Sequence, residues 1–527
     1  MKTKFYITTP IYYPSGDAHI GHAYCTTICD ILARNKRLRG FETRFLTGTD
    51  EHGQKIKEHA QKANKETKAY VDEIVANFQK LWKLMEISND DFIRTTEDRH
   101  IKVVQDLFSQ MLKKEDIYLG EYKGWYCTEC EAFWTDIQVG EEHLCPDCHR
   151  PVHEQTEESY FFKCSKYVNQ LLDEYKKNPK LCFPTSRMNE MVNTFIKPGL
   201  QDLSVSRTSN DWGIQVKENP KHTVYVWLDA LANYISALGY HSSDDKLYQK
   251  FWADEKTEII HVIGADISRF HCIYWPMFLM STGLRLPDRI FVHGLLRIKD
   301  EKMSKSKGNV VSPYPLVERY GVDAVRYYLA REVTFGRDGE FTPEQFVERI
   351  NVDLANQLGN LLNRTVSMID KYFNGVIPAF KKGVTKFDSE IENMISATIR
   401  EYELNFDDLK VTEAITSVMN LVGRANKYID ETAPWVLAKE KKNDELASVM
   451  SHLANVLYVS SILLSPVLVH QAGAILEQLG IPDNLKNYQS IIKIGIVENF
   501  KVHKGAQLFP RLDSKKEIEY IKGLMKI

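Results

Sequence analysis

Residues 5–22 encode a strand, a loop and the start of a helix, and this stretch constrains the fold more than any other. An apolar, β-branched and aromatic run breaks at a proline and a glycine, and apolar residues then recur at helical spacing from residue 23 onward. His19 and His22 therefore fall on the first helical turn, where backbone N–H groups and the helix dipole favour an anion. Gly21 lets a ligand approach the backbone closely. We predict a polyphosphate site here, although two ordinary helix-start histidines fit this stretch alone equally well.

Residues 302–306, with the sequence KMSKS, form a basic segment that runs into the turn signal Gly308-Asn309. The pattern predicts a movable loop. Taken alone, a short basic loop of this kind is usually just solvated.

Four of the nine cysteines occur as two pairs, Cys127-x-x-Cys130 and Cys145-x-x-Cys148, separated by 14 residues. This is zinc-ribbon spacing, and four thiolates fill a tetrahedral shell with no position left for water. We predict one structural zinc. His143, His149 and His153 lie nearby, and one of them could replace a cysteine as a ligand. The remaining five cysteines are isolated and predict buried apolar thiols.

A second predicted strand ends in the sequence TGTDEHG, which carries Asp50. In an open α/β sheet the carboxyl end of a strand faces the ligand. Asp50 is therefore a candidate for holding an ammonium group, and the alternative is a capping aspartate at a strand-to-helix turn. Residues 48–55 superficially imitate a phosphate-binding loop, but Gln54 stands where the lysine belongs.

Composition fits a cytoplasmic enzyme of about three domains. The net charge of −3 gives no general nucleic-acid signal, so RNA binding would need local basic patches. The odd number of cysteines, with four in paired spacing, indicates a reducing compartment. No signal peptide opens the sequence, and the longest apolar stretch, 456–469, is interrupted by serines and a proline. We therefore predict a protein that is neither secreted nor membrane-spanning.

The histidine and lysine segments together resemble HIGH and KMSKS, the two signature sequences of class I aminoacyl-tRNA synthetases. The resemblance is most specific to the methionyl-tRNA synthetases and covers nearly the whole chain, through PIYYPSGDAHIGH, TGTDEHG, the two cysteine pairs, VYVWLDA, HVIGADISRFH and KMSKSKGN. It implies an α/β fold in which a Rossmann-type parallel-sheet catalytic domain is split by a zinc-containing connective insertion and followed by an all-α helix-bundle anticodon-binding domain. The implied boundaries are 1–116 and 226–345 for the catalytic halves, 117–225 for the insertion and 346–527 for the bundle.

The resemblance also implies the site residues. His19, His22, Lys302 and Lys305 would be catalytic, because lysines on a movable loop can meet the charge that builds as pyrophosphate leaves ATP. Positions matching the family's methionine site are Ile11, Tyr13, Asp50, Trp227, Ala230, Tyr234, Ile267 and His271. ATP, with magnesium, would contact His19, Gly21, His22, Gly264, Asp266, Lys302 and Lys305. From residue type alone, the aromatic positions would be read as core, and Gly264 with Asp266 as a turn with a capping acid.

A helix after residue 346 places Asn356, Asn360 and Arg364 four apart on one stripe, with leucines largely on the other side. Such a face is usually only solvated. The resembling family uses these positions, with the tryptophan that matches Trp435, to read the anticodon.

The resemblance predicts methionine–tRNA ligation, with methionine, ATP and tRNA(Met) as partners and no membrane. Two alternatives stay open: a class I synthetase for another amino acid, and a non-catalytic zinc-ribbon RNA-binding protein. Many family members extend into a C-terminal module that dimerises, whereas this sequence stops at Lys526-Ile527, so we expect a monomer.

Overall fold

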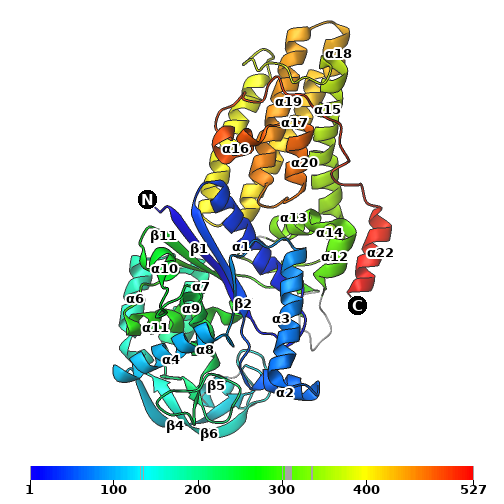
Figure 1. The fold of residues 1–527 in the computed structure, drawn as a ribbon. Coiled ribbons are helices and arrows are strands. Elements are labelled where there is room, and N and C mark those ends of the chain that lie inside the picture. The colour runs from blue at the N-terminus through cyan, green and yellow to red at the C-terminus, as the bar shows by residue number, and fades with distance from the viewer. Residues whose placement is uncertain are drawn as a thin grey trace. The chain divides into compact units, whose positions relative to one another are not determined.

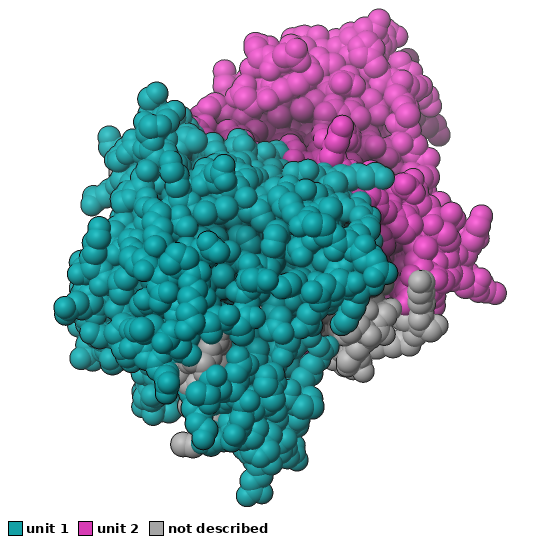
Figure 2. Space-filling view, turned by 60° about the horizontal axis from the view of Figure 1, so that its bottom comes forward, with its two compact units in different colours: residues 1–18, 42–82, 88–294 teal, residues 19–41, 83–87, 295–527 magenta. Residues whose placement is uncertain are grey.

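A computed structural model of the chain describes residues 2–130, 132–134, 136–298, 301–302, 311–333 and 336–525. The chain divides into two compact units, coloured separately in Figure 2. Unit 1 comprises residues 1–18, 42–82 and 88–294, and unit 2 comprises residues 19–41, 83–87 and 295–527.

Unit 1 is built on a six-stranded parallel sheet (Figure 1) with the order β3-β2-β1-β11-β12-β7. The strands are β1 (Lys4–Tyr12), β2 (Glu42–Thr49), β3 (Asp91–Arg94), β7 (Cys182–Phe183), β11 (Thr257–Gly264) and β12 (Arg289–His293). β2 and β3 follow outward from β1 on one side, and on the other side β12 follows β11, with the earlier strand β7 at the edge. The carboxyl ends of β1 and β11 therefore meet at a topological switch point, where open α/β sheets bind ligands. The predicted α/β class is confirmed.

The central strands are almost entirely buried, because both faces of a parallel sheet are covered. Strand residues such as Tyr6 and Ile259 share one hydrophobic core with α4, α8 and α11. The helices of this unit are α2 (Gln54–Lys62), α3 (Thr67–Leu84, whose last two residues belong to unit 2), α4 (Asp98–Lys113), α5 (Asp136–Val139), α6 (Val168–Lys177), α7 (Thr185–Glu190), α8 (Val226–Leu231), α9 (Asn233–Ser236), α10 (Lys246–Tyr248) and α11 (Trp275–Thr282).

A second, antiparallel sheet of unit 1 carries the cysteine pairs, in the order β5-β4-β6-β8. Its strands are β4 (Ile117–Cys127), β5 (Ala132–Trp134), β6 (His153–Phe162) and β8 (Leu203–Ser204), and β9 (Ser206–Arg207) pairs with β10 (Thr223–Val224). The same chain segment also supplies β7 to the edge of the parallel sheet. The segment predicted as an insertion therefore contributes one strand to the parallel sheet.

Unit 2 is mainly helical, which confirms the predicted helical C-terminal region. The long helices α15 (Asn360–Phe373), α16 (Asp388–Asp407), α17 (Val411–Thr432) and α19 (Asn443–Leu464) form a bundle (Figure 1). Unit 2 also contains α1 (Ile20–Leu38), β13 (Leu296–Ile298), β14 (Glu301–Lys302), α12 (Pro313–Tyr320), α13 (Val322–Glu332), β15 (Gly339–Glu340), α14 (Pro343–Arg349), the π-helical stretch η7 (Ile350–Gly359), α18 (Pro434–Lys439), α20 (Gln471–Gln478), α21 (Tyr488–Ile491) and α22 (Ser514–Leu524).

One helix of the described chain, α19, is long and apolar enough to cross a membrane by length and composition. Its most apolar window is 94% buried within the protein. This burial is that of a central bundle helix, whose apolar surface is covered by its neighbours on all sides.

The middle of α1 is fixed by a buried ion pair within unit 2. The guanidinium of Arg326 on α13 donates to Asp30 at 2.6 Å, and neither side chain is exposed. Arg326 also donates to the backbone carbonyls of Met85, Pro466 and Val467. Because every arm of the guanidinium has an acceptor, the buried charge is compensated.

The C-terminal half of α1 is held by the long helix α16. Asn35 donates to the hydroxyl of Tyr402 at 3.1 Å, and Lys36 and Arg39 both pair with Asp407. The helix that begins at the histidine motif is thus tied to the bundle along its length.

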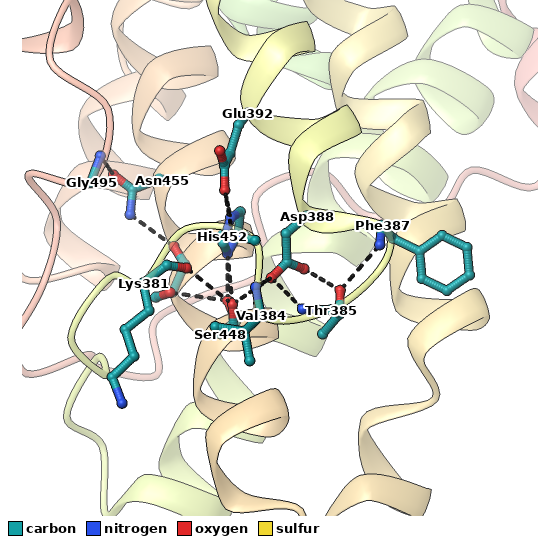
Figure 3. A network of polar contacts seen from close by, with 12 residues as sticks. Lys381, Val384, Thr385, Phe387, Asp388, Glu392, Ser448, His452, Asn455 and Gly495 are labelled. Atoms are coloured by element: carbon teal, nitrogen blue, oxygen red, sulfur yellow. Dashed lines mark hydrogen bonds and ion pairs between the residues drawn. The ribbon is translucent and has the colours of Figure 1, made fainter.

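A buried polar network joins α16, α17 and α19 (Figure 3). Asp388 accepts from the hydroxyls of Thr385, Tyr428 and Ser448, while His452 bonds to the backbone oxygen of Ser448. Burial opposes the ionisation of Asp388, but these hydrogen bonds outweigh it and lower the pKa of the carboxyl. The network fixes the start of α16 against the other two helices.

Candidate functional site

His19 and His22 cap the first turn of α1 reciprocally. His19 is the N-cap residue, and its Nδ1 accepts from the backbone N–H of Gly21 at 3.1 Å. His22 Nδ1 accepts from the backbone N–H of His19 at 3.0 Å, which completes a capping box. The centroids of the two imidazole rings lie 3.8 Å apart. The structure therefore confirms that both histidines act as helix-start residues.

Capping also determines which nitrogen of each imidazole ring carries the proton. A nitrogen that accepts from a backbone N–H carries no proton, so the neutral imidazole of each histidine carries its proton on Nε2. Each ring can therefore donate from Nε2 to a phosphate oxygen. A Cβ at Gly21 would lie 3.0 Å from the His19 ring, so glycine is needed for the ring to fold over the turn.

The described residues that flank the lysine segment contact elements at the start of unit 2. β13 packs against α1 and pairs with β14, which ends at Lys302. After the segment, the backbone oxygen of Val311 accepts from the N–H of Ile20, in the first turn of α1, at 2.9 Å. Lys305 lies outside the described residues. The described residues at the two ends of the lysine segment, Lys302 and Val311, thus contact α1 directly or through β13.

The predicted methionine pocket lies in unit 1, and two of its polar residues form a hydrogen-bonded chain. The hydroxyl of Tyr234 lies 2.7 Å from His271 Nε2, and His271 Nδ1 lies 3.0 Å from the backbone oxygen of Ile267. A carbonyl can only accept, so Nδ1 carries the proton and Nε2 accepts from Tyr234. Burial lowers the pKa of His271 to about 4, so the ring is neutral at pH 7.

Apolar walls surround this chain. Trp227 stacks on Phe270 at 3.9 Å and meets His271 edge-on at 6.1 Å. Ala230 is buried and Ile11 is partly buried against the same core. Such walls suit a flexible thioether.

Asp50 and Tyr13 flank the carboxyl ends of β2 and β1. Asp50 is 8% exposed, and its backbone N–H donates to the oxygen of Tyr12, which aligns the two strand ends. A buried carboxylate at this edge can hold an ammonium group. Phe270 was not singled out from the sequence, because an aromatic residue beside a histidine predicts core as readily as a pocket.

A buried polar network behind the pocket was also missed. Asp229 of α8 lies 2.7 Å from both His52 and His100, and His100 lies 2.7 Å from the hydroxyl of Ser236. Burial alone would raise the pKa of Asp229, but the two histidines lower it. The network ties the segment after β2 to the helix that carries Trp227. Its pairings join distant positions, and no local pattern reveals them.

The predicted adenosine contacts lie at the carboxyl end of β11. A Cβ on Gly264 would come within 2.6 Å of Asp266 Oδ1, so glycine lets this carboxylate lie against the strand end. His293, at the end of β12, is the register partner of Gly264 and is buried. It is a further candidate, and its only sequence signal was a histidine at a strand end.

Neutral His271 makes stability depend on pH. Between its folded pKa of about 4 and its ordinary value of 6.5, the unfolded chain binds a proton that the folded chain does not. Stability is therefore lost as pH falls through this window. We expect the wild type to lose about 2 kcal/mol more than His271→Gln between pH 7 and pH 5.

Urea unfolding at both pH values measures this difference. Buried His261 is present in both proteins, and because burial is the main cause that lowers its pKa, ahead of His271, most of its contribution is common to the two. Equal losses in the two proteins would contradict a neutral His271.

The four predicted zinc ligands form one cluster. The sulfur atoms of Cys127 and Cys148 lie 3.5 Å apart, those of Cys130 and Cys145 lie 3.7 Å apart, and all four fall within 4.8 Å of one another. Zinc–sulfur bonds of about 2.3 Å in a tetrahedron place sulfurs about 3.8 Å apart. The donor set and its spacing fit zinc, and the separations are far too long for a disulfide.

Two of the three neighbouring histidines contact aromatic rings. The ring of His143 stacks on Trp125 at 4.0 Å, and His153 meets Tyr126 edge-on. Among the described residues, the ligand cluster consists of the four cysteines alone.

Cys145→Ser is expected to remove most of the one zinc equivalent, because a hydroxyl is a far weaker ligand than a thiolate. Metal analysis of the purified protein measures this loss. Cys164→Ser, at a buried cysteine outside the cluster, is the matched control and should keep its zinc. Full, tightly held zinc in Cys145→Ser would contradict the assignment.

The predicted anticodon residues lie on one side of the bundle in unit 2. Asn356 and Asn360 are exposed, whereas the intervening Leu358 is buried. Arg364 pairs with Asp430 on α17 at 2.8 Å. Arg364 of the predicted set is thus linked to the last turn of α17.

Trp435 follows directly from that turn. α17 ends at Thr432, Ala433 adopts a left-handed conformation, and Pro434 starts α18 at a position where proline is favoured. The side chain of Trp435 is 49% exposed. A core role for this indole is therefore excluded, and its ring is available for stacking.

Comparison with known proteins identifies close relatives. A family model described as tRNA synthetases class I (M) matches residues 5–155 and 150–366, and one described as the anticodon binding domain of methionyl tRNA ligase matches residues 378–514. The methionine–tRNA ligase of Bacillus subtilis is 54% identical over 99% of this chain and 80% of its own length. That of Listeria innocua is 52% identical over 100% and 80%.

Solved structures of methionyl-tRNA synthetases are also similar to this chain. The Mycobacterium tuberculosis methionyl-tRNA synthetase in complex with methionyl-adenylate superposes with a TM-score of 0.92 at 39% identity, covering 97% of this chain and 100% of that one. Its apo form superposes with a TM-score of 0.85 at 36% identity, covering 97% and 99%.

Proposed function

The chain belongs to the methionine–tRNA ligases of the class I tRNA synthetases, and from that premise we propose how its residues perform the reaction. The observation that supports the proposal is the hydrogen bond from Ile20 N to Val311 O, which holds a residue that follows the lysine segment beside the first turn of α1. The relatives do not favour the two alternatives, a synthetase for another amino acid and a non-catalytic RNA-binding protein.

In the first step, a carboxylate oxygen of methionine attacks the α-phosphorus of ATP, and the bond to the pyrophosphate oxygen breaks. Nε2–H groups of His19 and His22 donate to the phosphates, and Lys302 and Lys305 meet the charge on the departing pyrophosphate. Magnesium bound with ATP would neutralise further phosphate charge. Asp50 holds the methionine ammonium, and Gly264 with Asp266 contacts the adenosine.

The methionine side chain lies among Ile11, Tyr13, Trp227, Ala230 and Ile267, with Tyr234 and His271 as its polar neighbours. In the second step, a terminal ribose hydroxyl of tRNA(Met) attacks the carbonyl carbon of methionyl-adenylate and AMP leaves. The zinc held by the four cysteines is structural, because its ligand shell is full.

Methionine-dependent exchange of labelled pyrophosphate into ATP tests this function. We expect exchange with methionine and background rates with leucine or cysteine. Failure with methionine and success with another amino acid would overturn the assignment.

Trp435→Ala should impair tRNA charging while leaving tRNA-independent exchange nearly intact. Losing one stacked base costs about 1 to 3 kcal/mol in binding single-stranded nucleic acid. The variant should also discriminate less between a CAU anticodon and altered ones. Steady-state charging of both tRNAs measures this.

Val436→Ala, which trims the neighbouring exposed apolar residue, is the control and should charge normally. If Trp435→Ala slowed both reactions equally, Trp435 would act on folding and not on the anticodon.

We also propose a cytoplasmic monomer. Light scattering that shows a concentration-independent dimer would refute the monomer.

A further inference from the structure

Arg269 lies between the predicted pocket residues Ile267 and His271, but its side chain has a different environment. The guanidinium carbon lies over three aromatic rings, 4.6 Å from the centre of Trp134, 4.8 Å from Phe270 and 5.3 Å from Phe195. The side chain is only 13% exposed. Cation–π contacts strengthen when they are shielded from water, so this enclosure holds the guanidinium firmly.

Two contacts of Arg269 belong to the cysteine knuckle, defined here as residues 127–148. Asp147, which lies between the ligands Cys145 and Cys148, pairs with the guanidinium at 3.7 Å. Trp134 packs in the small apolar cluster that also contains Cys127 and Cys145. The position of the guanidinium therefore depends on the knuckle.

The third contact leads to the pocket. Phe270 stacks on Trp227 at 3.9 Å with an interplanar angle of 4°, and Trp227 in turn meets His271. One aromatic ring thus separates the Arg269 guanidinium from the pocket wall formed by Trp227.

The guanidinium also covers part of the aromatic wall. A cavity of about 860 Å³ borders Trp134, Phe195, Arg269 and Phe270. Phe270 is nevertheless only 5% exposed, and the Arg269 guanidinium 4.8 Å from its ring is one of the groups that keep it so.

We propose that Arg269 is a positioning residue that ties the cysteine knuckle to the aromatic wall of the methionine pocket. The inference rests on the proposed function and adds a determinant of methionine affinity outside the pocket lining. Arg269 touches no reacting atom, so its loss should weaken methionine binding and spare both ATP binding and the chemical step.

Arg269→Met keeps the length of the side chain and removes its charge. We expect the KM for methionine in pyrophosphate exchange to rise about tenfold, as loss of shielded cation–π contacts implies. The KM for ATP and kcat should stay within about twofold of wild type, since Arg269 takes part in neither ATP binding nor the chemical step. Arg269→Lys keeps the charge, so its KM for methionine should lie between those of the wild type and Arg269→Met.

A double-mutant cycle tests the link to the knuckle. Asp147→Asn should raise the KM for methionine less than Arg269→Met does, and the double variant should be no worse than Arg269→Met alone. Arg187→Met, at an arginine of α7 paired with Glu190, is the matched control and should match wild type.

Zinc content provides a readout independent of activity and should remain one equivalent in every variant. Loss of zinc in Arg269→Met would mean that the residue stabilises the knuckle itself, which would overturn the proposal. An unchanged methionine KM, or an equal rise in both KM values, would also overturn it. Absence of exchange in the wild type would instead refute the proposed function.

Discussion

Asp30→Ala is expected to destabilise unit 2 by about 3 to 5 kcal/mol, because it strands the Arg326 guanidinium without its carboxylate. Both side chains are fully buried, so water cannot replace the lost partner. Three backbone carbonyls would still accept from Arg326, but they carry no compensating charge. The urea midpoint of unfolding measures the loss.

Two further variants separate charge burial from general damage to α1. Asp407→Ala breaks ion pairs of the same helix at a carboxylate that is 48% exposed, and should cost at most about 1 kcal/mol. Adding Arg326→Met to Asp30→Ala should recover much of the stability, since an apolar pair needs no compensation. If Asp30→Ala were as stable as Asp407→Ala, the buried pair would not be what secures this helix.

Lys305→Ala is expected to lower the rate of adenylate formation by about 3 kcal/mol of transition-state stabilisation, roughly a hundredfold, with little change in methionine affinity. The reason is that, in the proposed mechanism, the lysine meets charge that exists only as pyrophosphate leaves. Five residues lie between Lys305 and Val311, whose backbone oxygen accepts from the first turn of α1. Single-turnover measurement of adenylate formation tests the effect.

Lys307→Ala removes the same charge from the same segment and is the matched control. A comparable loss in both variants would indicate a general electrostatic field rather than one placed group. A raised KM with unchanged kcat in Lys305→Ala would mean that the lysine binds ground state and transition state equally.

The fold class follows from local patterns in the sequence. The apolar runs that become β1 and β11 are long enough to predict buried parallel strands, and the segment from 346 onward has helical periodicity. β7 was not predictable, because two residues carry no period. The attachment of α1 to the bundle was equally hidden, since Asn35 and Tyr402 are 367 positions apart and each looks ordinary in its own helix.

The residues of the candidate site likewise fall into two groups: those that a local sequence pattern predicts and those that only the fold brings together. Spacing identified the four cysteines, because metal geometry demands short-range pairs. The Asp147–Arg269 ion pair and the buried Asp229 network depend on how distant segments fold together, and acidic or basic residues at those positions would ordinarily predict a solvated surface. Resemblance to a family supplied the pocket residues, whereas the structure supplied what supports them.

The reciprocal cap on α1 has a consequence for how acid affects this enzyme. Protonating either histidine turns its accepting Nδ1 into a donor that faces a backbone N–H, so an imidazolium would loosen the very turn that presents it. If His19 and His22 bind ATP as proposed, they do so as neutral dipoles, and the lysines and a magnesium ion bound with ATP would supply the positive charge. An imidazolium at either position would thus work against nucleotide binding, contrary to what adding positive charge near a polyanion would suggest.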